Sequence, residues 1–348
     1  MLSRVADSIY WMARYVERAE NLSRLLLSTQ DLLLDAGADA ADAAQFWLPI
    51  LMATGDEEGY AEMYPSVTGA SVVEFLTLRA DNDNSMLNSV RAARENARTV
   101  RDQISDEMWV CINGLRLFLE SSEARSMCLH QPAAFFERVL ISSYQFQGIA
   151  ESTTPRGETR HFLRLGTMLE RADKVSRLLD TCSALPTELS PNAGGRSLRW
   201  AALLRSCSAW HAFQTLSAKL DPVKIIEYLL LDETFPRSIT YCLNEAHATL
   251  LDLCGHGTMS DMGQPVRLAG RLAADLRYTT VDEVIEAGLH DFIDDLQTRL
   301  NNIGTSIYET FVLYAERTPM EPVTSFSWQR GAWHGGDEAD AQMQQQQQ

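Results

Sequence analysis

The chain has 348 residues, of which 45% are hydrophobic, and it carries a formal net charge of −17. This apolar content suffices for a folded core and excludes a chain that is disordered throughout. The charge disfavours nucleic-acid binding, because such proteins need clustered Lys and Arg to displace counterions from phosphates. An acidic surface also suits a partner with a basic face.

The six cysteines contain no Cys-x-x-Cys pair, and a helical pattern starts directly at the N-terminus without a secretory signal. We therefore expect reduced thiols in a cytoplasmic protein. The longest apolar runs, such as residues 228–231, are far too short to cross a membrane, so no membrane association is expected.

Helical periodicity begins at Val5, and apolar positions recur every three or four residues as far as Leu26. Similar helical faces follow in eight further segments: 84–105, 134–150, 160–181, 198–220, 223–231, 237–254, 281–303 and 305–316. Pro and Gly fall in the breaks between the faces. The pattern predicts an all-α bundle of about ten helices.

An internal repeat is the strongest signal in the sequence. Residues 15–27 read YVERAENLSRLLL and residues 168–180 read MLERADKVSRLLD, an offset of 153. The same offset aligns Trp47 with Trp200, Leu51 with Leu204, Glu74 with Glu227 and Ser85 with Ser238. We infer two tandem copies of one helical unit, at 1–153 and 154–318, packed in one globule with pseudo-twofold symmetry.

The last segment, 319–348, differs in composition. It contains Pro and Gly and ends in QMQQQQQ, which predicts a disordered polar tail.

The repeated helix carries two stripes of interest. One is polar, as expected for a solvated or cleft-facing side, and consists of Tyr10, Arg14, Glu17, Asn21 and Arg24. The neighbouring stripe is apolar except for Arg18, and the second copy places Arg171 in the matching position. A guanidinium cannot lose its charge, so a buried one needs a carboxylate or several carbonyl acceptors.

Two interpretations follow for the repeated Glu-Arg units. In the structural one, Glu17 pairs with Arg171 and Glu170 pairs with Arg18, which fixes how the two halves dock. In the functional one, these four residues line a central cleft that binds an anion or a partner side chain. The side chains expected at such a cleft or interface are Tyr10, Arg14, Asn21, Arg24 and Arg177.

Arg237 and Ser238 follow Pro236, which fits a first helical turn. The free N–H groups of a helix N-terminus attract anions, so these two residues form a possible anion site. Simple capping of the helix, with Asp232 to Thr234 as the capping segment, is the alternative.

Catalytic signatures are otherwise absent. The sequence has no phosphate-binding Gly-x-x-x-x-Gly-Lys-Ser/Thr loop, no His-Glu-x-x-His and no Gly-x-Ser-x-Gly, and its seven histidines are scattered. We expect neither a metal nor a cofactor.

Four segments resemble the bacterial alpha-E family, which is named for a Glu-Arg motif. They are the opening MLSRVADSIYWMARYVERAENLSRLL, SVRAARENARTVRDQIS (89–105), FLRLGTMLERADKVSRLLD (162–180) and LLLDETFPRSITYCL (229–243). The resemblance covers 1–318 and leaves the tail outside. The sequence departs from the family pattern in two places: Thr167 replaces a frequent Arg, and residues 81–84 replace a turn that commonly contains proline.

Alpha-E proteins are typically encoded beside a circularly permuted ATP-grasp protein and a transglutaminase-like protein. The resemblance therefore implies a role in forming or processing amide-linked peptides. One hypothesis is an accessory subunit that binds the ATP-grasp ligase or its acceptor peptide. The expected contacts are the polar stripe and the tail, which carries Trp328 and Trp333. The alternative is an independent enzyme of amide or peptide metabolism that uses a Glu-Arg cleft. A third hypothesis is a purely structural role, as a stable dimeric bundle with no ligand.

Overall fold

The computed structural model describes residues 1, 3–37, 44–184, 193–254 and 263–313, and the structural statements below concern these ranges. They contain sixteen α-helices and one short π-helix, and no strand. The all-α prediction is confirmed, whereas the expected number of about ten helices was too low. The segment predicted to be a disordered tail lies outside the described residues.

The helices, in chain order, are α1 (Ser3–Ala36), α2 (Ala44–Thr54), α3 (Glu57–Met63), α4 (Gly69–Thr77), α5 (Met86–Thr99), α6 (Asp106–Leu119), α7 (Ser122–His130), α8 (Pro132–Thr153), α9 (Glu158–Ala184), α10 (Ala193–Ser206), α11 (Trp210–Leu216), α12 (Pro222–Leu231), α13 (Ile239–Cys254), α14 (Gln264–Tyr278), α15 (Val281–Ala287), α16 (Leu289–Tyr308) and the π-helix η2 (Glu309–Leu313). In the described part of the chain, none of them combines the length and apolarity needed to cross a lipid bilayer.

Local sequence signals set many of these helix starts. Ser85, Ser105 and Ser121 each accept a hydrogen bond from a backbone N–H in the first turn of the helix that follows. Thr68 and Thr280 form capping boxes, reciprocal bonds between the cap and the third helical residue.

One expected helix, at 198–220, is in fact two. The chain turns between α10 and α11, where Ser208 has a φ of +53°. That left-handed conformation is uncommon for a residue other than glycine. No Pro or Gly marks the turn, so periodicity alone could not reveal it.

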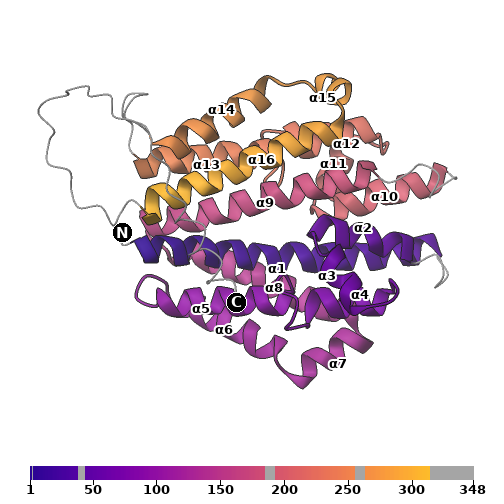
Figure 1. Ribbon diagram of the computed structural model, residues 1–348, viewed down its shortest axis with the longest axis horizontal. Coiled ribbons are helices and arrows are strands. Elements are labelled where there is room, and N and C mark those ends of the chain that lie inside the picture. Colours follow the sequence, from indigo (N-terminus) through magenta and orange to yellow (C-terminus); the bar gives the residue numbers. More distant parts are fainter. Residues whose placement is uncertain (2, 38–43, 185–192, 255–262, 314–348) are drawn as a thin grey trace, which may run out of the picture. The chain divides into compact units, whose positions relative to one another are not determined.

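The long helices α1 and α9 lie side by side at the centre (Figure 1). They run in the same direction, because contacts advance together from Tyr10 with Gly166 to Glu17 with Arg171. Gly166 is required at the crossing, since a Cβ there would lie 2.4 Å from the carbonyl oxygen of Tyr10. The close approach brings the side chains of the two repeated segments within bonding distance of each other.

The remaining helices cover this central pair. Helix α1 packs against α5, α8 and α10, and α9 packs against α13, α16 and α2 (Figure 1). Helices α5 and α6, and likewise α13 and α14, pack against each other in the outer part of the structure.

The apolar core has two clusters that share α1. Its residues from Ala6 to Val16 belong to the cluster that also contains the buried residues of α13, α14 and α16, and within it α1 packs mainly against α9 and α5. Its residues from Ala19 to Leu26 pack with the helices of the first 150 residues. The charged residues Glu17 and Arg18 therefore lie where α1 passes from one cluster to the other.

Candidate functional site

Glu17 is the centre of one half of the charged site and is 1% exposed. Its Oε1 accepts hydrogen bonds from Arg171 Nε at 2.9 Å and Arg237 Nη1 at 2.8 Å. Its Oε2 accepts from Arg171 Nη2 and Gln147 Nε2, each at 3.1 Å. Four donors therefore surround one carboxylate, which satisfies its bonding capacity.

Glu170 is the centre of the other half and is fully buried. It accepts from Arg14 Nε at 2.7 Å on Oε2, and from Arg18 Nε at 2.7 Å on Oε1. Lys174 Nζ lies 4.0 Å from Oε1. The two reciprocal pairings expected from the repeat, Glu17 with Arg171 and Glu170 with Arg18, are both present.

A third buried carboxylate, Glu20, joins the first half. It accepts hydrogen bonds from Arg24 Nη2 at 2.5 Å, from Gln147 Nε2 at 2.5 Å and from Arg237. Arg24 also donates to the hydroxyl of Ser208 at 2.8 Å. Ser208, in the turn that follows α10, thus joins this part of the chain to Arg24.

We call the charged residues around these carboxylates the Glu-Arg network. Its members are Glu17, Glu20, Glu170, Asp173, Arg14, Arg18, Arg24, Arg171, Lys174, Arg177 and Arg237. Cations outnumber carboxylates in it, although the chain as a whole is strongly acidic. The network is therefore a local positive centre inside an acidic protein.

The arginines hold two of the carboxylates ionised. Burial alone would raise the pKa of Glu17, but Arg171 and Arg237 outweigh it and lower the pKa to about 2. Burial likewise opposes ionisation of Glu170, and Arg14, Arg18 and Lys174 reverse the effect and lower its pKa. A carboxylate that is ionised and fully bonded at neutral pH is poorly suited to general acid–base catalysis.

Glu20 behaves differently from its neighbours. Burial and the adjacent negative charge of Glu17 raise its pKa, and Arg237 and Arg24 only partly compensate. Two carboxylates that share arginines cannot both be stabilised as anions to the same extent.

The polar stripe of α1 is turned inward and is not a solvated face, whereas Tyr10 and Arg14 do line a cavity, as the cleft-facing alternative expects. Tyr10 and Arg24 are buried and Asn21 is half-buried. Arg14 is pinned between Glu170 and the hydroxyl of Tyr10. Among the described residues, Arg177 bonds only Asp173, four residues earlier on α9, and it is partly exposed. The stripe is turned inward because α9, α8 and α10 all pack on α1.

The suggested anion site at Arg237 and Ser238 also needs correction. Pro236 lies in the turn before α13 rather than in its first helical turn, and Arg237 points into the network. Ser238 caps the helix, accepting from the backbone N–H of Tyr241 at 3.1 Å. Capping is thus the correct alternative for Ser238, although Asp232 ends α12 and does not cap α13.

Sequence reasoning missed Glu20, Asp173, Gln147 and Lys174. The repeat contained a signal for two of them, because Glu20 and Asp173 are aligned by the 153-residue offset. Each lies four residues before an arginine, the spacing of a helical ion pair. Gln147 comes from α8 and carries no comparable signal. No described His, Cys, Asp or Glu residues group into a cluster that could hold a metal ion.

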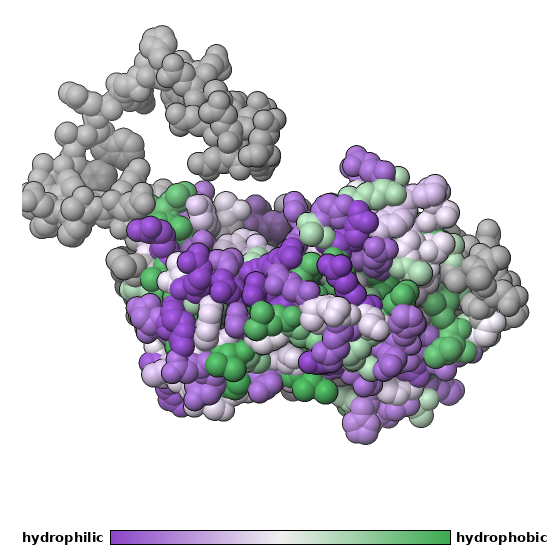
Figure 2. Space-filling model, turned by 90° about the horizontal axis from the view of Figure 1, so that it is seen from below, coloured by the Kyte–Doolittle hydropathy of each residue, from purple (hydrophilic) through white to green (hydrophobic). Residues whose placement is uncertain are grey.

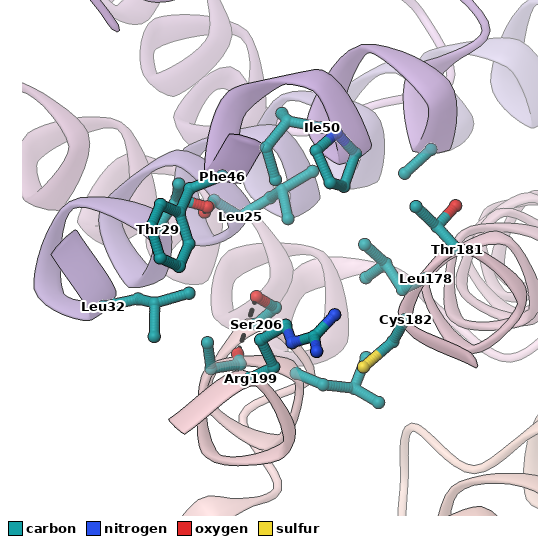
Figure 3. A pocket seen from close by; sticks show the side chains of 14 residues that line it. Leu25, Thr29, Leu32, Phe46, Ile50, Leu178, Thr181, Cys182, Arg199 and Ser206 are labelled. Carbon is teal, nitrogen blue, oxygen red and sulfur yellow. Dashed lines mark hydrogen bonds between the residues drawn. The ribbon is translucent and has the colours of Figure 1, made fainter. Parts of the chain in front are cut away.

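A small apolar cavity lies next to the network, between α1, α2, α9 and α10 (Figure 3). Its volume is about 80 Å³, and Leu25, Ile50 and Leu178 are among the side chains that line it. An engineered cavity of about 150 Å³ holds benzene, so this smaller space suits only a very small group. We assign it no function.

Comparison with known proteins gives a family match and three relatives. Residues 1–312 match the family Alpha-E, described as a predicted alpha-helical domain with a conserved ER motif. An uncharacterized protein of Mycobacterium bovis is 25% identical over 319 residues, which are 87% of this chain and 35% of that protein. Uncharacterized proteins of two Mycobacterium tuberculosis strains match at 25% and 24% identity with the same coverage. No solved structure matches. The chain thus spans about a third of the length of the curated relatives it matches.

Proposed function

Because the chain belongs to the Alpha-E family, we propose that it is a non-catalytic partner of an ATP-grasp amide ligase. It would bind the circularly permuted ligase, or hold the acceptor peptide near it, and a transglutaminase-like protein is a further candidate partner. The observation that carries the proposal is the saturation of the Glu-Arg motif. Glu17 and Glu170 are at most 1% exposed, and each is bonded by two arginines.

The lengths of the curated relatives also support a partner role. In those proteins the matching region accompanies about twice its own length of additional chain. A module that is joined to further sequence in its relatives is a reasonable candidate for contact with a separate chain. The strong negative charge would speed encounter with a basic partner face.

Exposed apolar side chains supply candidate contacts for such a partner. Val110 and Leu117 on α6, Leu129 on α7 and Ile141 on α8 are each more than half exposed. Apolar patches on the face seen in Figure 2 are small and separated by hydrophilic residues. A contact made there would be partly polar, as is usual for complexes whose components also exist alone.

The alternative is an independent enzyme of amide or peptide metabolism. Glu20 favours it, because a raised pKa is typical of groups that transfer protons. Glu20 is nevertheless fully buried and bonded to Arg24, Arg237 and Gln147. Substrate would have to displace these bonds to reach it.

Co-purification and ATP turnover test the proposal together. The neighbouring ATP-grasp protein should co-elute with this chain in size exclusion at low salt, and salt should dissociate the complex. Ile141→Glu should weaken co-elution, and Ile285→Glu, an exposed position on α15, serves as the control. If the ligase elutes alone at every salt concentration and its turnover ignores this chain, the independent-enzyme alternative replaces the proposal.

We also propose that the domain arose by duplication of one helical unit. A near-twofold axis, parallel to α1 and α9, would relate the two halves. Matched packing supports this: α5, α8 and α10 lie on α1 as α13, α16 and α2 lie on α9. Gly55 and Ser208, aligned by the same offset, both have positive φ. Superposition of 1–153 on 154–318 in an experimental structure should give a rotation near 180°, and a rotation far from that value would refute the symmetry.

A further inference from the structure

A larger cavity lies at the end of the domain where α1 begins. It has a volume of about 510 Å³ and is bordered by α1, α9, α16 and η2. Figure 1 shows α1, α9 and α16 side by side in this region. Ligand sites typically measure about 300–1,000 Å³, so the space suits a small organic molecule. It adjoins the π-helix, a feature that is frequent at functional sites.

Asp7 is the distinctive group on the wall of this cavity. It is half-buried, and its carboxylate has no ion-pair partner in the part of the chain that the structure describes. Burial raises its pKa, and a hydrogen bond from Trp11 only partly offsets this. A ligand cation bound in the cavity would supply the counter-charge that Asp7 lacks there.

The other charges on the wall are already compensated. Arg14 donates to Glu170 at 2.7 Å, and Asp173 is bonded to Arg177 and lies 3.3 Å from Lys174. Asp7 is therefore the one wall residue in the described chain whose charge is uncompensated.

Aromatic side chains form much of the remaining wall. Tyr308 is 44% exposed, and Phe311 packs edge-on against Phe162 with ring centroids 5.3 Å apart. The faces of such rings attract an ammonium group, and their surface also accepts an alkyl chain.

A second cavity provides an internal comparison. The 153-residue offset takes Asp7, Trp11 and Arg14 to Arg160, Arg164 and Thr167, which line a cavity of about 270 Å³ between α9 and α8. There the charges are satisfied within the chain, because Arg160 bonds Glu151 and Arg164 bonds Glu245. An unpaired charge is therefore a property of the first cavity and not of the repeated architecture.

We propose that the cavity between α1, α9 and α16 is a binding site for a small organic cation. An alkylammonium group would place its charge on Asp7 and its alkyl chain against Tyr308 and Phe311. The proposal is independent of the ligase partnership, since it rests only on the wall of the cavity.

Isothermal titration of the full chain with n-butylammonium tests the site. The cation should bind at least about tenfold more tightly than 1-butanol of the same shape, because a charge-assisted hydrogen bond is worth more than a neutral one. Butyrate should not bind. Equal affinity for butylammonium and butanol would overturn the proposal.

Two variants locate the site. Asp7→Asn should remove the preference for the cation, whereas Asp31→Asn on the same helix, outside the cavity lining, should keep it. Gly304→Leu should block binding while the chain stays folded, because a Cβ at Gly304 meets only open space. Binding that survives Gly304→Leu, or that responds equally to both Asp variants, would place the cation elsewhere and contradict the proposal.

Discussion

Glu17 and Glu170 occupy matching positions on parallel helices, yet their arginines come from different places. Glu170 is held by Arg14 and Arg18, both on α1. Glu17 is held by Arg171 on α9 and by Arg237 from the turn before α13. The first pairing ties one helix to its neighbour, and the second also ties in a third segment of the chain.

Sequence differences between the halves explain the contrast. The offset aligns Arg14 with Thr167 and Arg237 with Asn84, so each half lacks one arginine that the other has. Each buried glutamate nevertheless obtains two. Both buried glutamates therefore bind two arginines, although the arginines come from different positions in the two halves. This indicates that the core requires compensation of each carboxylate's charge rather than an arginine at a fixed position.

The largest effect is expected from Glu170→Gln. The change removes the carboxylate that Arg14 and Arg18 share, and within the described part of the chain Arg14 then keeps only the hydroxyl of Tyr10 as a side-chain hydrogen-bond partner. Breaking a buried pair by removing one partner typically costs about 3–5 kcal/mol. Urea denaturation measures the loss in the free energy of unfolding. A loss below about 1 kcal/mol, as at exposed pairs, would show that Glu170 is not buried as described.

Glu17→Gln should cost less than Glu170→Gln, by about 1 kcal/mol, the net worth of a typical hydrogen bond. The reason is that Arg171 keeps Gln147 and Arg237 keeps Glu20 as acceptors. The same urea titration gives the ranking. A larger loss for Glu17→Gln would mean that these second acceptors do not compensate.

Acid should weaken the domain through Glu17 and Glu170, whose pKa values are lowered on folding. Their contribution is fully present above the unfolded pKa of about 4.5 and is lost as the pH falls toward 2. The free energy of unfolding of the wild type should decrease through this window. Glu170→Gln should flatten the decrease, and an unchanged slope in that variant would contradict the assignment.

Glu20→Gln should have a smaller effect at pH 7, within about 1 kcal/mol of the wild type. The pKa of Glu20 is raised, so its ionised form is disfavoured on folding and a neutral replacement removes that cost. Thermal or urea unfolding at pH 7 measures the difference. A loss as large as that of Glu17→Gln would show that ionised Glu20 is an equal member of the network.

The smallest effects concern the matched caps, Ser85 on α5 and Ser238 on α13. Replacement of either by Ala should cost about 1 kcal/mol, the usual value for a helix N-cap. The two losses should agree closely if the halves use the same local design. Losses that differ by more than about 1 kcal/mol would show that the two caps do not contribute equally to stability.

The sequence predicted the paired motif for a physical reason. Arg18 and Arg171 stand in otherwise apolar stripes, and a charged residue there requires a specific partner. The repeat then suggested which glutamate that partner was. The helix count, by contrast, was underestimated, because short helices such as α3 and α7 give too few turns for a periodic signal.

Other members of the network could not be predicted from local pattern. Arg237 was assigned to a helix start because Pro236 suggested one, whereas the direction of its side chain depends on how α13 packs on α9. Gln147 reaches Glu17 and Glu20 from α8, across 130 and 127 residues of sequence. Such contacts are set by tertiary packing, which periodicity does not encode.

A double-mutant cycle on Glu17 and Arg171 tests most directly whether the Glu-Arg motif locks α1 to α9. Residues in one hydrogen-bonded ion network show coupling energies of about 0.5–3 kcal/mol. The structure predicts that Glu17→Gln with Arg171→Met costs at least about 1.5 kcal/mol less than the sum of the single changes, in the upper part of that range. Additive losses, with a coupling energy near zero, would contradict the account.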